Sequence, residues 1–429
     1  MTESEGTLRK RRLLVVSMLA QLVAACGGGG DAPAPAVPAP PGPAPAPVPA
    51  PVPAPGPGVG PAPTVPASPS PPPPPPAPPS PQLTRVAGPV IPPSSPPTAV
   101  DGPGTTARFR GINSLCVDAD GTAFVVDQGR LRRLAPDGTV TTLPGGPFAS
   151  PIAGYPLAFQ HQVIVANATS LFVIDDAGLR HVGKDGTLLG SWYWKIIGEA
   201  AIPGTPLGPF VAAWAMAVDR ADNLLVIDRV DPPEDGRWQV RRMSADGTTV
   251  VDLPGGRIDD GVPGRLAADA AGNVYVTMSA RGGSFCIDRC YESFKTGWIR
   301  KITPDGQSSV LAGSKQERGA VDGFGEAARF WLPHDIVVDA GGNLLVSDPL
   351  NHAVRRVDPA GNVTTVVGSL TATTHASVLG PLPALVHNPA ELAMAPDGQL
   401  LISTGGIGET TGDQRVRSAG YAVLKADLR

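Results

Sequence analysis

The chain repeats one unit of four short apolar segments, and this repeat restricts the possible folds more than any other feature. The clearest copy has its segments at residues 336–338, 344–348, 354–357 and 363–368. Turn-forming residues, chiefly Gly beside Asp or Asn, separate the segments, as in antiparallel strands joined by hairpins. Such a four-stranded sheet cannot bury both of its faces alone, so it must stack against further copies of itself.

Six copies can be aligned on the last residue of their second segment. These residues lie at positions 127, 175, 228, 278, 348 and 404. The spacing of 48 to 70 residues is that of β-propeller blades that carry loop insertions. The sequence therefore predicts an all-β fold, a six-bladed β-propeller with four-stranded antiparallel blades.

The third segment of most copies places two basic residues between apolar ones. This pattern predicts a third strand that is more exposed to solvent than its neighbours. The pairs are Arg132-Arg133, Arg180-His181, Arg241-Arg242, Arg300-Lys301 and Arg355-Arg356.

The sixth copy lacks a fourth segment, because the sequence stops three residues after its third segment, residues 422–426. A matching fourth segment lies at the other end of the globular region, at residues 83–88. It precedes residues 101–109, which match residues 322–330 at six of nine positions. We therefore expect residues 83–88 to complete the last blade and close the ring, which protects strand edges.

These motifs resemble those of the NHL-repeat β-propeller family. The resemblance rests on the Asp-x-x-Gly-Asn turn at residues 339–343, on Val-Ser-Asp ending at Asp348, on Asn351-His352, and on the basic third segment. An outer-strand Gly followed by Asp-Gly-x-Gly and Ala-Arg-Phe is typical of the bacterial members. The resemblance covers residues 82–429 and implies six blades. Some six-bladed relatives are lyases or lactonases.

Residues 1–25 have the features of a bacterial lipoprotein signal peptide. A basic tetrapeptide at residues 9–12 precedes an apolar stretch, residues 13–22, which is too short for a permanent transmembrane helix. Val-Ala-Ala-Cys at residues 23–26 resembles a lipobox, which implies that Cys26 becomes lipidated after cleavage. An ordinary secretory signal is the alternative. Gly rather than Asp follows Cys26, which, by resemblance to enterobacterial sorting rules, implies the outer membrane of the cell envelope.

Residues 26–81 form a predicted linker between the lipidated cysteine and a propeller that occupies residues 82–429. Residues 31–81 contain 26 prolines, so this segment cannot form a core and should favour the polyproline II conformation. We expect a disordered stalk that holds the propeller away from the membrane. A ligand for proline-binding domains is the alternative.

Charge and cysteine content restrict the partners and cofactors. The net charge of −4 and the lack of a basic tract beyond residues 9–12 argue against nucleic-acid binding. Cys286 and Cys290 lie in an insertion of the fourth copy, where a local disulfide is expected and a metal pair is the alternative. Cys116 should be a small buried apolar residue. No cofactor is expected unless one of the metal alternatives holds.

Aspartates recur at the ends of the second segments and could serve as catalytic carboxylates. Their repetition indicates a structural role instead, because a residue present once per blade usually caps the same turn by accepting backbone N–H groups. These residues are Asp127, Asp175, Asp228 and Asp348. The sequence contains no Gly-x-Ser-x-Gly or His-Glu-x-x-His motif.

The candidate ligand-binding residues come from the segments that lead into the first strands. In a propeller these segments surround one end of the central channel, on a top face that also carries the longest second-to-third-strand loops, residues 229–237, 279–297 and 405–420. His161 and His334 are three blades apart and should face each other across the channel. A metal held between them is one alternative, and a solvated rim without a ligand is another. The candidates are His161, Trp214, Arg265, His334, Asp335 and Glu391.

The sequence favours a non-enzymatic function. The stalk, the one-sided insertions and the lack of a catalytic motif point to a membrane-anchored envelope propeller that binds a protein, peptide or glycan through its top face. One alternative is a metal-assisted, lyase- or lactonase-like enzyme at the mouth of the channel. The other is a structural spacer without a ligand. The propeller itself is expected to be monomeric.

Overall fold

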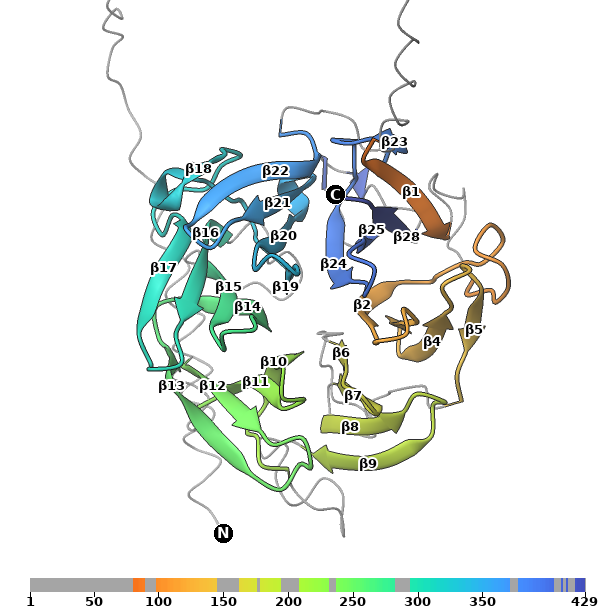
Figure 1. The fold of residues 1–429 in the computed structure, drawn as a ribbon, viewed down its shortest axis with the longest axis horizontal. Coiled ribbons are helices and arrows are strands. Elements are labelled where there is room, and N and C mark those ends of the chain that lie inside the picture. Colours follow the sequence, from red (N-terminus) through yellow and green to blue (C-terminus); the bar gives the residue numbers. More distant parts are fainter. Residues whose placement is uncertain are drawn as a thin grey trace, which may run out of the picture. The chain divides into compact units, whose positions relative to one another are not determined.

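The computed structural model describes residues 80–88, 98–144, 162–175, 178–193, 208–230, 237–281, 294–370, 377–404, 410–411, 414–415 and 421–428. All of them belong to Pro76–Arg429, the second of two compact units into which the chain divides. Within this unit, six antiparallel sheets surround a central axis (Figure 1).

Each sheet is one blade, and its first strand lies nearest the axis (Figure 1). Blade 1 consists of β2 (Ile112–Val117), β3 (Ala123–Asp127), β4 (Arg130–Leu134) and β5 (Val140–Thr142). Blade 2 consists of β6 (Val163–Ala166), β7 (Ser170–Ile174), β8 (Gly178–Gly183) and β9 (Leu188–Tyr193). Blade 3 consists of β10 (Ala213–Val218), β11 (Leu224–Arg229), β12 (Trp238–Met243) and β13 (Val250–Ile258).

The other three blades follow the same order. Blade 4 consists of β14 (Val262–Ala268), β15 (Val274–Arg281), β16 (Phe294–Ile302) and β17 (Ser308–Gly313). Blade 5 consists of β19 (Ile336–Val338), β20 (Leu344–Asp348), β21 (Ala353–Val357) and β22 (Asn362–Gly368). Blade 6 consists of β24 (Pro389–Met394), β25 (Leu400–Thr404), β28 (Ala422–Ala426) and β1 (Gln82–Ala87).

Several short strands and turns are present in addition to the six blades. Two extra strands pair with outer strands: β18 (Gly323–Phe324) with β22, and β23 (Gly380–Pro381) with β1. The 3-10 turns η4 and η5 span Gly325–Ala327 and Pro349–Asn351. A separate hairpin joins β26 (Thr410–Thr411) to β27 (Gln414–Arg415). The predicted all-β, six-bladed architecture is confirmed.

The ring closes through the N-terminal strand, as the sequence predicted. Strand β1 pairs antiparallel with β28, with Leu83 opposite Ala426 and Ala87 opposite Val423. Figure 1 shows the two strands side by side, although they lie near opposite ends of the chain. Because β1 supplies the outer strand of blade 6, this blade has four strands like the others.

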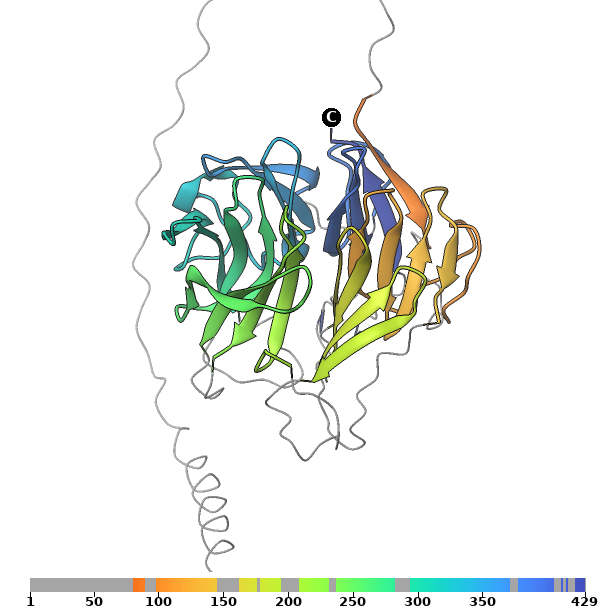
Figure 2. The ribbon, with the colours of Figure 1, turned by 60° about the horizontal axis from the view of Figure 1, so that its bottom comes forward.

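Apolar packing between neighbouring blades holds the ring together. Six hydrophobic clusters are present among the described residues, one at each junction between adjacent blades. The second strands lie between neighbouring blades, and all five residues of β20 are buried. Figure 2 shows the blades standing side by side around the axis. A strand covered on both faces explains why the second segments read as continuous apolar runs.

In blades 1 and 5 the third strand is less exposed to solvent than the sequence predicted. Arg132 and Arg355, the first basic residues of their pairs, are fully buried. Successive side chains of a strand point to opposite faces, and in these two pairs only the second residue is exposed or partly exposed, as Arg356 is. In blades 3 and 4 both residues of the pair are partly exposed. The guanidinium of Arg355 donates to the carboxylate of Asp322 at 2.6 Å and to the carbonyl oxygen of Val321 at 2.8 Å.

The junction between blades 1 and 6 contains a cavity of about 230 Å³. Ala123, the first residue of β3, lines this cavity. Among blades 1 and 3 to 6, it is the smallest residue at its register position. The same position, opposite the last residue of the first strand, is occupied by Leu224, Val274, Leu344 and Leu400 in blades 3 to 6. A short side chain at this position therefore accounts for part of the unfilled volume.

We expect Ala123→Leu to raise the free energy of unfolding by about 1 kcal/mol. The three added carbon atoms would occupy the cavity, and burial of each contributes up to about 0.8 kcal/mol before the loss of side-chain entropy. Denaturant unfolding measures the change. Leu344→Ala, the reverse substitution at the equivalent position, should cost about 2–5 kcal/mol. A loss of stability in Ala123→Leu would show that the leucine does not reach the cavity.

Candidate functional site

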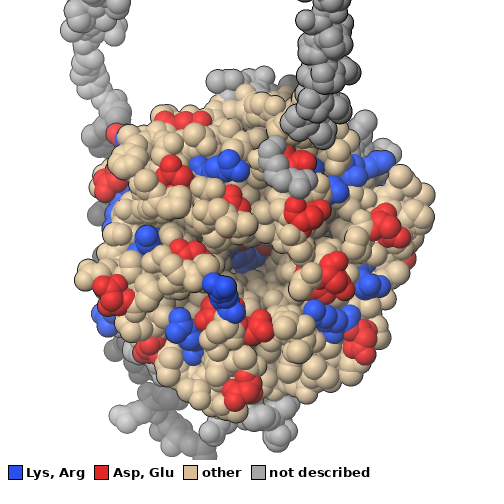
Figure 3. Space-filling view, in the orientation of Figure 1, with Lys and Arg blue, Asp and Glu red and all other residues tan. Residues whose placement is uncertain are grey.

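The first strands of all six blades enclose a cavity of about 240 Å³ at the centre of the ring. Figure 3 shows the corresponding hollow, with a basic side chain inside it. Among the described residues that line the cavity, Arg265 is the one with a basic side chain. The cavity therefore has a charged group in its interior rather than only at its edge.

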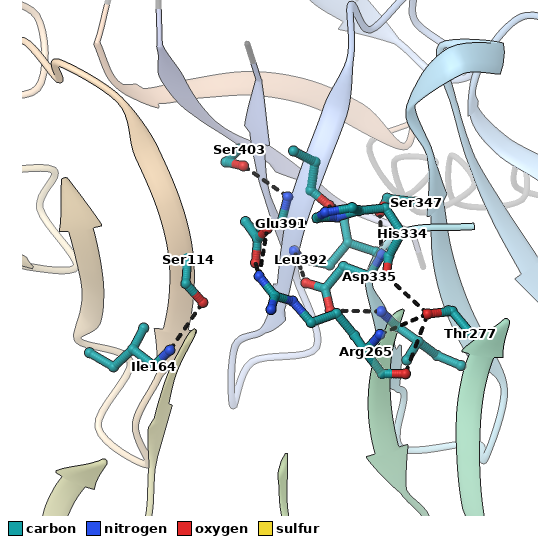
Figure 4. Close-up of polar contacts among 12 residues, drawn as sticks. Ser114, Ile164, Arg265, Thr277, His334, Asp335, Ser347, Glu391, Leu392 and Ser403 are labelled. Carbon is teal, nitrogen blue, oxygen red and sulfur yellow. Dashed lines mark hydrogen bonds and ion pairs between the residues drawn. The ribbon is translucent and has the colours of Figure 1, made fainter. Parts of the chain in front are cut away.

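Three charged side chains lie at the beginnings of first strands in consecutive blades. Arg265 comes from blade 4, Asp335 precedes β19 in blade 5, and Glu391 comes from β24 in blade 6. Their exposed fractions are only 6%, 8% and 4%. The Nη2 atom of Arg265 lies 3.2 Å from each carboxylate oxygen of Glu391 (Figure 4). This ion pair joins blade 4 to blade 6.

Asp335 connects blade 5 to blade 6 through its carboxylate. Oδ1 accepts the backbone N–H of Ile336 at 2.8 Å, and Oδ2 accepts the backbone N–H of Leu392 at 2.7 Å (Figure 4). Each oxygen of an ionised carboxylate can accept two hydrogen bonds. These two bonds fix the orientation of Asp335 and leave capacity for a further donor.

Each of the three charged residues is hydrogen-bonded through its backbone to a hydroxyl group on the second strand of its blade. In blades 4, 5 and 6 this hydroxyl accepts the backbone N–H of the charged residue. The pairs and their N–O distances are Arg265 with Thr277 (2.8 Å), Asp335 with Ser347 (2.9 Å) and Glu391 with Ser403 (2.9 Å). Thr277 and Ser347 also donate to the carbonyl oxygens of His334 and Ala390 in the next blade, at 3.1 and 2.7 Å.

Blades 1 to 3 lack both parts of this arrangement. Their residues at the hydroxyl position are apolar, and their residues at the charged position are uncharged. The pairs are Ser114 with Val126, Val163 with Ile174 and Ala215 with Ile227. Charge and supporting hydroxyl thus occur together in the same three blades. Each hydroxyl residue lies one position before the last residue of its second segment, the residue on which the copies are aligned. This recurring hydroxyl is a sequence signal that the alignment of the copies did not reveal.

His334 lies close to the Arg265–Glu391 ion pair. Its Nδ1 atom is 3.4 Å from the carbonyl oxygen of Ala390 and 3.7 Å from Oε1 of Glu391. Although 27% of its side chain is exposed, burial and the positive charge of Arg265 lower the pKa of His334 to about 4. His334 is therefore neutral at neutral pH. His161 lies outside the described residues, so its predicted approach to His334 stays a prediction.

The two carboxyl groups of the site hold their protons more strongly than ordinary carboxyl groups do. Burial, and then the negative charge of Glu391, raise the pKa of Asp335 to about 6, against the opposing effect of Arg265. Burial also raises the pKa of Glu391, while Arg265 and the hydroxyl of Ser114 lower it. The charge of the site therefore changes just below neutral pH, as Asp335 takes up or releases its proton.

The candidates from the sequence divide into a buried group and a separate residue. Arg265, Asp335 and Glu391 come together as predicted, but they are buried, so these residues do not form the solvated rim that was one alternative. Trp214 is not among the residues that line the cavity. It packs with the core between blades 3 and 4, with its ring centroid 5.6 Å from that of Trp238.

The predictions about metal binding and about the roles of the cysteines have different outcomes. No group of three or more His, Cys, Asp or Glu side chains suited to holding a metal ion is found among the described residues. Cys26, Cys286 and Cys290 lie outside the described residues, so the lipid anchor and the disulfide remain predictions. Cys116 is buried in the junction between blades 1 and 2, as expected, and burial raises the pKa of its thiol.

The recurring aspartates have the capping role that was expected of them. Oδ1 of Asp127 accepts the backbone N–H groups of Arg110 and Gly111, both at 2.8 Å. Backbone N–H groups also donate to the carboxylates of Asp175, Asp228 and Asp348. Because these bonds connect the second strand to the segment before the first strand, or close a hairpin, they serve the scaffold.

Comparison with known proteins identifies the fold but no family. No family model matches the chain, and no curated protein matches it. Among solved structures, a Bacteroides thetaiotaomicron protein of unknown function is 19% identical, with a TM-score of 0.53. Auxiliary nutrient binding proteins from Bacteroides thetaiotaomicron and Bacteroides ovatus are 13% and 16% identical, with TM-scores of 0.53 and 0.54. All three matches cover 81% of this chain and 76% of the other.

These similarities support the propeller fold independently of the internal repeats. At this level of identity they do not extend to function. Among the described residues, no helix is both long and apolar enough to cross a membrane.

Proposed function

We propose that this chain is an NHL-type propeller lipoprotein of the bacterial envelope and that its propeller is a binding module with the ligand site in the central cavity. The observation that carries the proposal is the buried network of Arg265, Asp335 and Glu391 beside that cavity. Burying charged groups costs free energy even when they are paired. Blade 3 forms its first strand with Ala215 at the same position, so the scaffold does not require these charges.

The similar structures agree with a binding role. Two of them are described as auxiliary nutrient binding proteins, and each shares the propeller fold over most of this chain. A small nutrient-derived molecule is therefore a reasonable ligand for the central cavity. A protein, peptide or glycan bound at the top face is the wider form of the same hypothesis.

The proposed location follows from the N-terminal sequence. Cleavage before Cys26 and lipidation of its thiol would tether the chain to the outer membrane, and residues 26–81 would act as a spacer. Replacing Cys26 by Ser should move the protein from the membrane fraction to the soluble fraction after cell lysis. A Cys26→Ser variant that stays membrane-bound would refute the anchor without affecting the binding hypothesis.

A thermal-shift screen of the Cys26→Ser chain against small metabolites, oligosaccharides and peptides tests the binding function. A ligand that binds only the folded state raises the melting temperature in a concentration-dependent way. The effect should be lost in the double variant Arg265→Met/Glu391→Met, which removes both partners of the buried ion pair together.

The matched control is Glu317→Met/Arg329→Met, which removes an exposed ion pair with a distance of 2.9 Å. It should leave the ligand response unchanged. A response that survives in the central-cavity variant would place the ligand elsewhere, such as on the top face. If no compound gives a saturable shift, the spacer alternative is favoured over the binding module.

A further inference from the structure

The central cavity contains one more carboxylate than it contains cationic groups. Its charged lining residues are Arg265, Asp335 and Glu391. His334 beside them is neutral at pH 7, since its pKa is lowered to about 4. Cys116, also in the lining, is neutral because burial raises the pKa of its thiol. When both carboxyl groups are ionised, the described part of the site has a net charge of −1, which favours the uptake of one positive charge.

The charge lies on one side of the cavity. Figure 4 shows Arg265, Asp335 and Glu391 close together, with Ser114 of blade 1 beyond them. The wall formed by blades 2 and 3 is nonpolar. Its lining residues are Val163, Ile164, Val165, Ala166, Met216, Ala217 and Val218. A complementary ligand would combine a polar cationic end with a short apolar body.

Asp335 is the group best placed to receive the cationic end. Glu391 already shares both of its oxygens with Arg265, at 3.2 Å each. Each oxygen of Asp335 accepts one backbone N–H, which leaves each able to accept a second donor. A metal ion is less suitable, because it would need several ligands, and no group of three or more His, Cys, Asp or Glu side chains suited to holding one occurs in the part of the chain that the structure describes.

We propose that the central cavity binds a small organic monocation, a primary ammonium group on a short apolar body, with Asp335 as its counter-ion. This inference rests on the proposed function, because it specifies the ligand class for the same site. The cavity volume of about 240 Å³ is below the roughly 300–1,000 Å³ of typical sites for drug-sized ligands. The ligand should therefore be small.

The proposed binding depends on pH with a definite sign. Protonation of Asp335 removes the negative charge that would hold the ammonium group. Because the pKa of Asp335 is raised to about 6, affinity should be constant above pH 7 and should fall about tenfold per pH unit well below 6. Protonation of Glu391, or of His334 near pH 4, would weaken cation binding in the same direction.

Isothermal titration calorimetry of the Cys26→Ser chain at pH 7.5 tests the ligand class, with n-butylammonium as the probe. 1-Butanol and butyrate are the neutral and anionic counterparts of similar size. We expect saturable one-to-one binding of butylammonium, at least tenfold tighter than that of either counterpart. The proposal is overturned if butylammonium does not bind, if butanol or butyrate binds as tightly, or if calcium chloride binds more tightly than butylammonium.

Asp335→Asn should weaken butylammonium binding at least tenfold and remove the fall in affinity that is centred near pH 6. Asp397→Asn makes the same change in an exposed turn and should leave both properties unchanged. If Asp335→Asn does not fold, the pH profile of the Asp335-containing chain decides, since equal affinity at pH 8 and pH 5 contradicts the proposal. A screening hit that depends on Arg265 and Glu391, without butylammonium binding, would refute the ligand class and keep the binding function.

Discussion

Deletion of residues 82–88, which removes β1, should abolish the cooperative unfolding transition of the propeller or lower its midpoint severely. The deletion removes Leu83 and Ala87, which are buried in the junctions on either side of blade 6. It also exposes the edge of β28, which pairs with β1. The loss should exceed the roughly 2–5 kcal/mol of a single buried leucine truncation, because a strand and a ring closure are lost together.

Two further variants separate ring closure from loss of the N-terminal region. Deletion of residues 31–75 removes part of the linker but none of the described residues, and it should leave the melting temperature unchanged. Moving residues 82–88 to a position after Arg429, behind a short turn, should restore much of the lost stability. That placement makes the transplanted strand the fourth of its blade in chain order, as in the other blades. An unchanged melting temperature after deletion of β1 would refute closure by this strand.

The internal repeats were sufficient to predict the blades and the closing strand, because both depend on local pattern. Alternating turns and apolar runs define each hairpin, and the missing fourth segment fixes the phase of the ring. Register was less certain where a copy is degenerate. In blade 2, Val163, two residues after the candidate His161, holds the register position that Ser114 holds in blade 1. A shift of one residue turns a side chain to the opposite face.

The residues of the candidate site were also predicted in part from the local pattern of the repeats. Arg265, Asp335 and Glu391 were identified correctly, since each lies near the start of a first strand in a well-conforming copy. Their burial was not predicted, because it results from the convergence of three blades. The supporting hydroxyls of Thr277, Ser347 and Ser403 are visible in the sequence only once the second strand is known to face the start of the first. Trp214 lies next to Ala215, the residue at the equivalent position, where the pairing of its strand is irregular.

The buried arginines illustrate a long-range signal that the pattern of one strand does not contain. Arg132 and Arg355 belong to the two copies preceded by the repeated residues 101–109 and 322–330. In each case the guanidinium pairs with the first aspartate of that repeat, Asp101 at 2.8 Å or Asp322 at 2.6 Å. Each guanidinium also lies over the phenylalanine that ends the repeat, at 5.3 and 5.1 Å from the ring centroid. The repeat therefore marks the two third-strand arginines that are fully buried.

Arg355→Leu should lower the free energy of unfolding by about 3–5 kcal/mol, because it leaves a buried carboxylate without its ionic partner. Asp348 is fully buried and would lose the guanidinium 3.5 Å away. Asp322 and the carbonyl oxygen of Val321 would also lose a donor. Arg356→Leu is the matched control on the next residue, where the guanidinium is one-third exposed and 3.9 Å from Asp339.

The control should cost less than about 1 kcal/mol, as is usual for exposed ion pairs. Denaturant unfolding of both variants measures the difference, and salt provides a second distinction. Added salt should reduce the small effect of Arg356→Leu but change that of Arg355→Leu little, because buried pairs are screened less. Equal losses in the two variants would mean that the basic third strand acts through its total charge. A large loss confined to Arg355 would show that the first arginine of this pair is a buried structural element of its blade.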